Sequence, residues 1–277
     1  MAVLMERQLW SDIDHMRYQP TPKRVRVRLG PATVADTTNA LLVWEPKRVV
    51  PSYAVPIADV DATLRELTAP APRPEHQPVG FGDDGPPMLD PSIPFVVHTS
   101  AGDQLDVVVG DEVRPAAAFR PADGDVHSHV VLDFDAFDWW EEDEPIVAHP
   151  RDPFHRIDVR RSSRVVRLEH EGQLLAESSR CRMLFEGVFP VVRYYLPADD
   201  VAVELRASDH RTECAYKGAA THYSATVGDE ELTDVAWSYE DPLDDAVPVR
   251  SLVCFYQERL DLSVDGERLP RVRTPWS

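Results

Sequence analysis

Apolar and polar residues alternate in short runs along most of the chain, at the two-residue spacing of half-buried β-strands. Arg24–Leu29 and Arg164–Leu168 are two such runs, each with valine or leucine at alternate positions. Small polar residues separate hydrophobic runs at Val227–Glu230 and Val264–Glu267, which predicts tight hairpin turns there. This pattern predicts a mainly β protein.

Helical signals are few and short. The best candidates are Asp59–Leu67 and Asp199–Leu205, each of which follows a proline and opens with an aspartate that can cap a first turn. The chain contains 25 prolines and 12 glycines, a balance that suits short strands closed by rigid turns better than long helices.

The same pattern occurs twice along the chain. Residues 23–65 align with residues 164–206 at a constant shift of 141 and without a gap, so that Tyr53-Ala-Val-Pro56 meets Tyr194-Tyr-Leu-Pro197. Such self-similarity indicates a duplicated structural unit.

Further along, the shift becomes 118, where Val109-Gly-Asp-Glu112 meets Val227-Gly-Asp-Glu230 and Phe137 meets Phe255. The change of 23 residues fits an insertion near Pro70–Ile93, a segment rich in proline, glycine and aspartate that predicts a loop. We therefore predict two pseudo-repeated small β domains, each with a short helix. Residues 1–148 form the degenerate first copy and residues 149–277 the second copy.

Several motifs of the second copy are recognisable together. They are His149-Pro-Arg-Asp-Pro153, Leu184-Phe-Glu186, Arg193-Tyr-Tyr-Leu-Pro197, Cys214-Ala-Tyr-Lys-Gly-Ala219, His222-Tyr223 and Ala236-Trp-Ser-Tyr239. This combination resembles domain-of-unknown-function family 427, over residues 149–270 and more faintly over 17–141. The resemblance implies an all-β, tent-like domain without an established reaction. A nucleotidyltransferase label carried by some members has no support here, because the chain lacks a Gly-Ser pair followed by metal-binding carboxylates.

Charge and cysteine usage narrow the function classes. The net charge is −19, from 48 acidic and 29 basic residues, a field that repels phosphate backbones and anionic lipid surfaces. We therefore expect neither nucleic acid nor membrane as a partner. No apolar run approaches the ~20 residues of a membrane span, and the charged N-terminal stretch does not read as a signal peptide, so we expect a cytoplasmic location. The three cysteines lack a CxxC pair, and neither a metal nor a cofactor is predicted.

Comparing the two copies separates positions needed for folding from candidates for function. Tyr194 keeps its counterpart Tyr53, which predicts a core role. Arg193 and Tyr195 have Ser52 and Ala54 as their counterparts in the first copy. Because side chains alternate along a strand, Arg193 and Tyr195 share one face while Tyr194 points to the other. The predicted ligand-binding residues are Glu186, Arg193, Tyr195, Cys214, Tyr216, Lys217, His222, Trp237 and Tyr239.

The first hypothesis is that this set binds a small polar metabolite. Aromatic walls with Glu186 would suit an organic cation such as a methylated amine, whereas Arg193 and Lys217 would suit a small anion. Plain core packing of the aromatic residues is the alternative, and Glu186, kept as Glu45, is also explained as a structural carboxylate. If the pocket exists, Lys217→Ala or Tyr195→Ala abolishes binding at nearly unchanged melting temperature.

Two other classes stay open. An enzyme of unknown reaction could use Lys217 as nucleophile, or a Cys214–His222 thiolate–imidazole pair. A structural or protein-interaction module could use the run Asp133–Glu144, whose alternation is typical of an edge strand with charges facing water. His127-Ser-His129 suggests metal ligands, but the second copy has no matching pair. The oligomeric state is not predicted.

Overall fold

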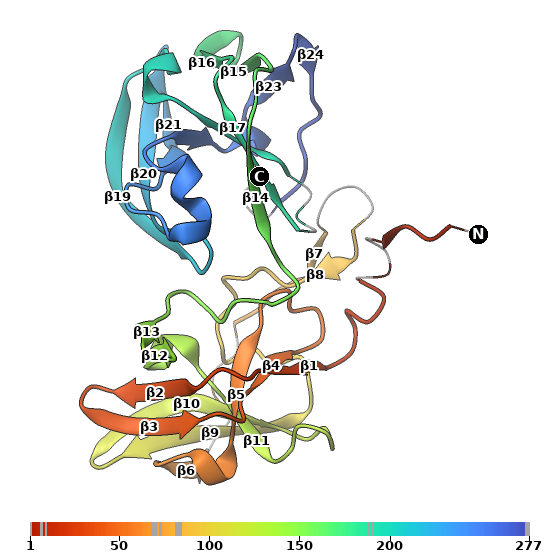
Figure 1. The fold of residues 1–277 in the computed structure, drawn as a ribbon, viewed down its shortest axis with the longest axis vertical. Coiled ribbons are helices and arrows are strands. Elements are labelled where there is room, and N and C mark those ends of the chain that lie inside the picture. The colour runs from red at the N-terminus through yellow and green to blue at the C-terminus, as the bar shows by residue number, and fades with distance from the viewer. Residues whose placement is uncertain are drawn as a thin grey trace. The chain divides into compact units, whose positions relative to one another are not determined.

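The computed structural model describes residues 2–5, 8, 10–67, 71, 74–80, 85–187, 189 and 191–274. The chain forms two compact units, residues 1–79 with 86–152, and residues 153–277 with 80–85. It is 49% strand and 8% helical, which confirms the predicted mainly β class (Figure 1). Among the described residues, no helix is long and apolar enough to cross a membrane.

The first unit contains a seven-stranded and a four-stranded antiparallel sheet. The larger has the order β1 (Arg17–Pro20), β4 (Leu41–Trp44), β5 (Ser52–Pro56), β11 (His129–Leu132), β10 (Glu112–Pro121), β9 (Gly102–Val109) and β6 (Thr63–Glu66). The smaller has the order β13 (Glu144–Pro145), β12 (Asp138–Glu141), β2 (Val25–Leu29) and β3 (Ala32–Thr37). The described part of the predicted insertion contains the two-residue strands β7 (Val79–Gly80) and β8 (Pro87–Met88).

The second unit has a corresponding pair of sheets. The larger has the order β14 (Ile157–Arg161), β17 (Arg182–Glu186), β18 (Arg193–Leu196), β22 (Val253–Phe255), β21 (Glu230–Ser238), β20 (Gly218–Val227) and β19 (Leu205–Cys214). The smaller has the order β16 (Gln173–Ser178), β15 (Val166–His170), β23 (Asp261–Val264) and β24 (Glu267–Arg268). Both predicted hairpin turns are present, between β20 and β21 and between β23 and β24.

The predicted short helices are 3-10 turns in the structure. They are η1 (Ile57–Asp59) and η3 (Ala198–Asp200), and the residues after them enter strands β6 and β19. The aspartates do not cap these turns. Instead, Asp59 accepts a hydrogen bond from the Thr37 hydroxyl at 2.6 Å, and Asp200 accepts the equivalent bond from Ser178 at 2.5 Å. Pairing with neighbouring strands overrides the local helix signal.

The predicted equivalence of Phe137 and Phe255 is wrong. Tyr195 pairs with Cys254 as its counterpart Ala54 pairs with Val131, so the shift in this segment is 123 rather than 118. The smaller sheets give the same shift, since Val166 pairs with Val264 and Val25 with Glu141. The extra five residues of the second unit lie between β21 and β22, in the connection that contains η4 (Asp244–Val249).

Each larger sheet carries apolar side chains on both faces. The inner face packs on the smaller sheet and contains Tyr53 in the first unit and Tyr194 in the second, which confirms the predicted core role of this tyrosine pair. The outer face of the second unit buries a separate cluster that includes Tyr195, Trp237, Tyr239 and Cys254, partly under residues of η4. Neighbouring residues of β18 thus point to opposite faces, as the alternation predicts.

Candidate functional site

A buried ion pair joins two of the predicted site residues. Lys217 lies in the turn between β19 and β20, just before Gly218, whose φ of +91° favours a residue without a side chain. Its ammonium donates a hydrogen bond to Oε1 of Glu186, at the end of β17. The side chains are only 10% and 13% exposed, so the pair is largely removed from water.

The electrostatics of this pair keep both groups charged. Burial opposes the charged form of Glu186, but the charge of Lys217, its hydrogen bond and the neighbouring His155 lower the pKa of this carboxyl group to about 2. Burial likewise opposes the charge on Lys217, yet Glu186 and Cys214 raise the pKa of the ammonium above its ordinary value. At neutral pH the pair is therefore a carboxylate and an ammonium.

Three further side chains surround the ion pair. His155 places Nε2 at 3.7 Å from Oε1 of Glu186, and its ring centroid lies 4.6 Å from that of Tyr216. The Lys217 amide donates a hydrogen bond to the Cys214 carbonyl at 3.2 Å, and the Cys214 side chain contributes to the raised pKa of Lys217. The Lys217 cluster consists of His155, Glu186, Cys214, Tyr216 and Lys217. His155 was not among the residues predicted from the sequence, although it follows the recognised motif at residues 149–153 by two positions.

Arg193 is held in a second, separate ion pair. Its guanidinium donates to both carboxylate oxygens of Glu258 at 2.7 and 2.6 Å, and Thr274 donates to the same carboxylate at 3.0 Å. The guanidinium carbon also lies 5.3 Å from the ring centroid of Trp237 and 5.9 Å from that of Tyr256. The Arg193 and Glu258 side chains are 6% and 0% exposed.

The predicted aromatic residues pack mainly against one another. The Trp237 indole donates to the Tyr195 hydroxyl at 3.4 Å, and the Tyr195 ring lies 6.5 Å from that of Tyr239. Burial raises the pKa of Tyr195 and of Tyr239 well above the usual value, so both phenols are neutral. Since Tyr195 has no exposed surface, truncating it is expected to destabilise the unit, unlike the unchanged melting temperature expected from sequence.

His222 lies apart from the Lys217 cluster. Cys214 pairs with Gly218 in the β19–β20 ladder. Gly218 precedes His222 by four residues, which corresponds to ~13 Å along strand β20. The nearest polar partner of His222 is Thr212, whose hydroxyl is 2.9 Å from Nε2, and the His210 ring lies at 4.4 Å. The hypothesised Cys214–His222 pair is therefore not formed in this arrangement.

His222 is expected to make stability depend on pH between 6.5 and 4. Burial, followed by the charge of His210, lowers the pKa of its imidazole from 6.5 to about 4. As pH falls through this window the unfolded chain takes up a proton first, so about 3 kcal/mol of stability is lost. Urea unfolding of wild type and His222→Gln should show a flatter profile for the variant. His127→Gln, at an exposed histidine, is the control; equal slopes in all three proteins would contradict the assignment.

The first unit keeps the carboxylate but changes its partners. Glu45 accepts a hydrogen bond from the amide of Thr99 at 2.8 Å and lies 2.9 Å from Nδ1 of His98. His98 stacks on Phe119 with ring centroids 3.7 Å apart. A histidine and backbone amides thus replace the lysine of the second unit.

Other candidate groups do not form a site. His127 and His129 contact the backbone carbonyls of Gly124 and Asn39. The Asp133–Glu144 run was predicted as an edge strand, but its central strand β12 lies between β13 and β2.

One metal-ligand grouping occurs within the described residues. His170, Glu171 and Glu230 have ligand atoms within 4.8 Å of one another. The Nε2 atom of His170 already lies 2.9 Å from a Glu230 oxygen, and both glutamates are exposed. Because exposed acidic groups gather in this way without an ion, no function is assigned to this group.

The fold and these contacts define a protein of two β units in which the few buried charged residues have charged or polar partners. The family model of domain of unknown function DUF427 matches residues 17–74 and 158–266, more than half of the chain. The chain belongs to this family. The two matched segments fall in different units, which is consistent with a duplicated domain. No curated protein matches the chain in sequence.

Proposed function

We propose that the second unit binds a small polar metabolite of no net charge at the Lys217 cluster. The observation that carries this proposal is the buried Lys217–Glu186 ion pair, which has a histidine and a thiol beside it at a partly exposed edge. The His155 side chain is 22% exposed and Cys214 is half-buried, so a ligand can reach the pair from this side.

Stability alone is a weak reason for such a pair. Removing two charges from water costs several kcal/mol per ion, and apolar residues of similar volume are often as stabilising. The first unit shows that this fold forms without the lysine, since His98 and backbone amides hold Glu45 there. Ionisable groups with shifted pKa values cluster at functional sites, which supports recognition at this pair.

Charge balance favours a neutral or zwitterionic ligand. Lys217 neutralises Glu186, and Glu258 neutralises Arg193, so the buried set carries no net charge. An ammonium offers three N–H donors and a carboxylate about four acceptor positions. A metabolite with both a donor and an acceptor can therefore bind across the pair, which argues against the methylated-amine and small-anion alternatives considered from sequence.

The test is a thermal-shift screen of neutral, zwitterionic, cationic and anionic metabolites. We expect a neutral or zwitterionic hit that stabilises wild type and slows iodoacetamide labelling of Cys214. The double variant Glu186→Gln with Lys217→Met removes both charges together and should fold but lose the hit. The matched control is the first-unit variant Glu45→Gln, which should keep it. A hit that survives the double variant would contradict the proposed site.

A further inference from the structure

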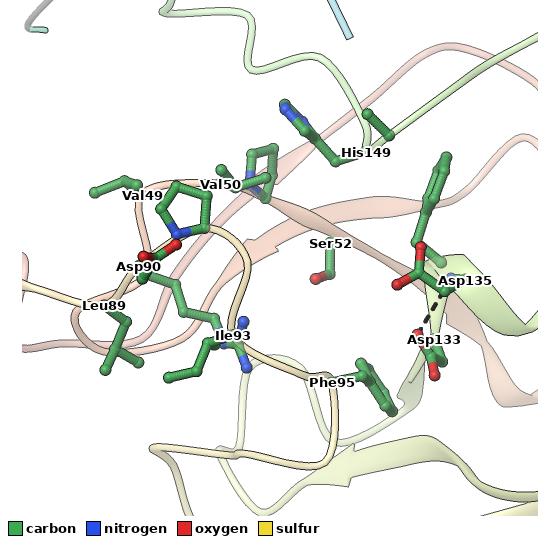
Figure 2. Close-up of a pocket in the computed structure, with 15 residues that line it drawn as sticks. Val49, Val50, Ser52, Leu89, Asp90, Ile93, Phe95, Asp133, Asp135 and His149 are labelled. Atoms are coloured by element: carbon green, nitrogen blue, oxygen red, sulfur yellow. Dashed lines mark hydrogen bonds between the residues drawn. The ribbon is translucent and has the colours of Figure 1, made fainter. Parts of the chain in front are cut away.

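The first unit contains a hollow of about 100 Å³ beside strand β5. Ser52 lies between the loop that carries Asp90, Ile93 and Phe95 and the segment that carries Asp133 and Asp135 (Figure 2). At ~30 Å³ per water molecule, the hollow holds about three waters or one small polar group. Its lining includes Arg48, Asp90, Phe95, Asp133, Phe134 and Asp135.

This hollow corresponds to the place of the Arg193–Glu258 ion pair in the second unit. Ser52 is the counterpart of Arg193 at the shift of 141, and Asp135 is the counterpart of Glu258 at the shift of 123. The two carboxylates occupy the middle of equivalent 3-10 turns, η2 (Phe134–Ala136) and η5 (Gln257–Arg259). The first unit has therefore lost the guanidinium of Arg193 and kept an acidic residue, the exposed Asp135, among those that line the hollow.

The neighbouring position adds a second carboxylate. Asp133 is the counterpart of Tyr256, whose ring lies beside the Arg193 guanidinium in the second unit. One Asp133 oxygen accepts a hydrogen bond from the Asp135 amide at 3.2 Å, and burial raises the pKa of Asp133 to about 6. At neutral pH, Asp133 is an ionised, half-buried carboxylate that a cation would stabilise.

Arg48 also lines the hollow, and its charge acts on both Glu45 and Asp133. Its Nη2 donates to the Val97 carbonyl at 2.6 Å, and its Nε lies 3.8 Å from the Glu45 carboxylate. The three acidic lining residues Asp90, Asp133 and Asp135 outnumber Arg48, so the hollow keeps an excess of negative charge.

We propose that the first unit binds a small molecule through its guanidinium group in this hollow, at the place that Arg193 fills in the second unit. Asp135 and Asp133 accept the N–H donors, as Glu258 does for Arg193. Phe95 and Phe134 line the hollow and offer aromatic faces to the planar cation. This site is separate from the Lys217 cluster and does not depend on it.

The probe for the experiment is methylguanidinium, with methylurea as a neutral compound of nearly the same shape. We expect chemical-shift changes in first-unit amides with methylguanidinium, and at least tenfold weaker binding of methylurea. Asp135→Asn should weaken methylguanidinium binding at least tenfold. Ser52→Arg should abolish it, because an internal guanidinium then fills the hollow.

The possible results distinguish recognition of the guanidinium charge from nonspecific filling of the hollow by any small molecule. The double variant Glu186→Gln with Lys217→Met should bind methylguanidinium as wild type does. Equal binding of methylurea, undiminished binding to a folded Asp135→Asn variant, or no shift changes up to tens of millimolar methylguanidinium would each overturn the proposal. Binding of acetate in place of the cation would assign the hollow to Arg48 and overturn it as well.

Discussion

Replacing Arg193 with methionine is expected to destabilise the second unit by about 3–5 kcal/mol. The variant leaves the Glu258 carboxylate in a site with no exposed side-chain surface, where its charge has lost both hydrogen bonds from the guanidinium. Typical total stabilities are about 5–15 kcal/mol, so the loss should be plain in urea unfolding followed by circular dichroism. A loss below about 1 kcal/mol, the scale of exposed ion pairs, would contradict the buried geometry.

The double variant Arg193→Met with Glu258→Leu is the control for this prediction. Replacing both members of a buried pair by apolar residues is often neutral or stabilising, so most of the lost stability should return. In the double variant the Thr274 hydroxyl also loses Glu258 as its hydrogen-bond acceptor. About 1 kcal/mol of the lost stability should therefore not return. A double variant as unstable as the single one would show that packing of the arginine, rather than its charge, dominates.

The parts of the fold that depend on the local alternation of apolar and polar residues were predictable from the sequence. Inward and outward positions of strands such as Val25–Leu29 follow the two-residue period, and the turn at residues 227–230 follows from its small polar residues. The predicted helix at Asp59–Leu67 was wrong because Thr63–Glu66 pairs with β9, a contact between distant segments. A local capping signal does not contain that information.

The register error has a similar cause. Aligning Phe137 with Phe255 relied on a matched aromatic residue, whereas the ladders align Phe255 with Leu132. The five added residues lie in a connection between strands, where length changes leave no periodic trace. Only the hydrogen-bonded pairs reveal the correct counterpart of Glu258.

The sequence predicted which site residues share a face of the sheet, but not which residues they interact with. Alternation places Arg193 and Tyr195 on the same side of β18, and both contact Trp237. The groups that decide their chemistry come from remote segments: Glu258 pairs with Arg193, and His155 joins the Lys217 cluster. The comparison of the two copies identified side chains that the first copy lacks. It did not predict the hollow that forms where smaller side chains such as Ser52 replace Arg193.

Replacing Lys217 with methionine is expected to lower the stability of the second unit by about 3–5 kcal/mol at neutral pH, because Glu186 loses its buried counter-charge. In wild type, the pKa of Glu186 is lowered from 4.5 to about 2 against the effect of burial, chiefly by the charge of Lys217. A carboxyl group with a lowered pKa contributes stability that is present above pH 4.5 and lost as pH falls toward 2. The difference between wild type and the variant should therefore shrink by about 3 kcal/mol across that window.

Urea unfolding at pH 7, 4.5 and 3 tests this expectation. Glu45 in the first unit also has a lowered pKa, so Glu45→Gln serves as the control: it should change the acid profile of its own unit and leave the Lys217→Met difference intact. Adding Glu186→Gln to Lys217→Met removes the titrating group, and this double variant should recover stability at pH 7. If Lys217→Met instead follows the wild-type profile at a constant offset, the ion pair does not set the charge of Glu186, and the proposed recognition of a neutral ligand across it loses its basis.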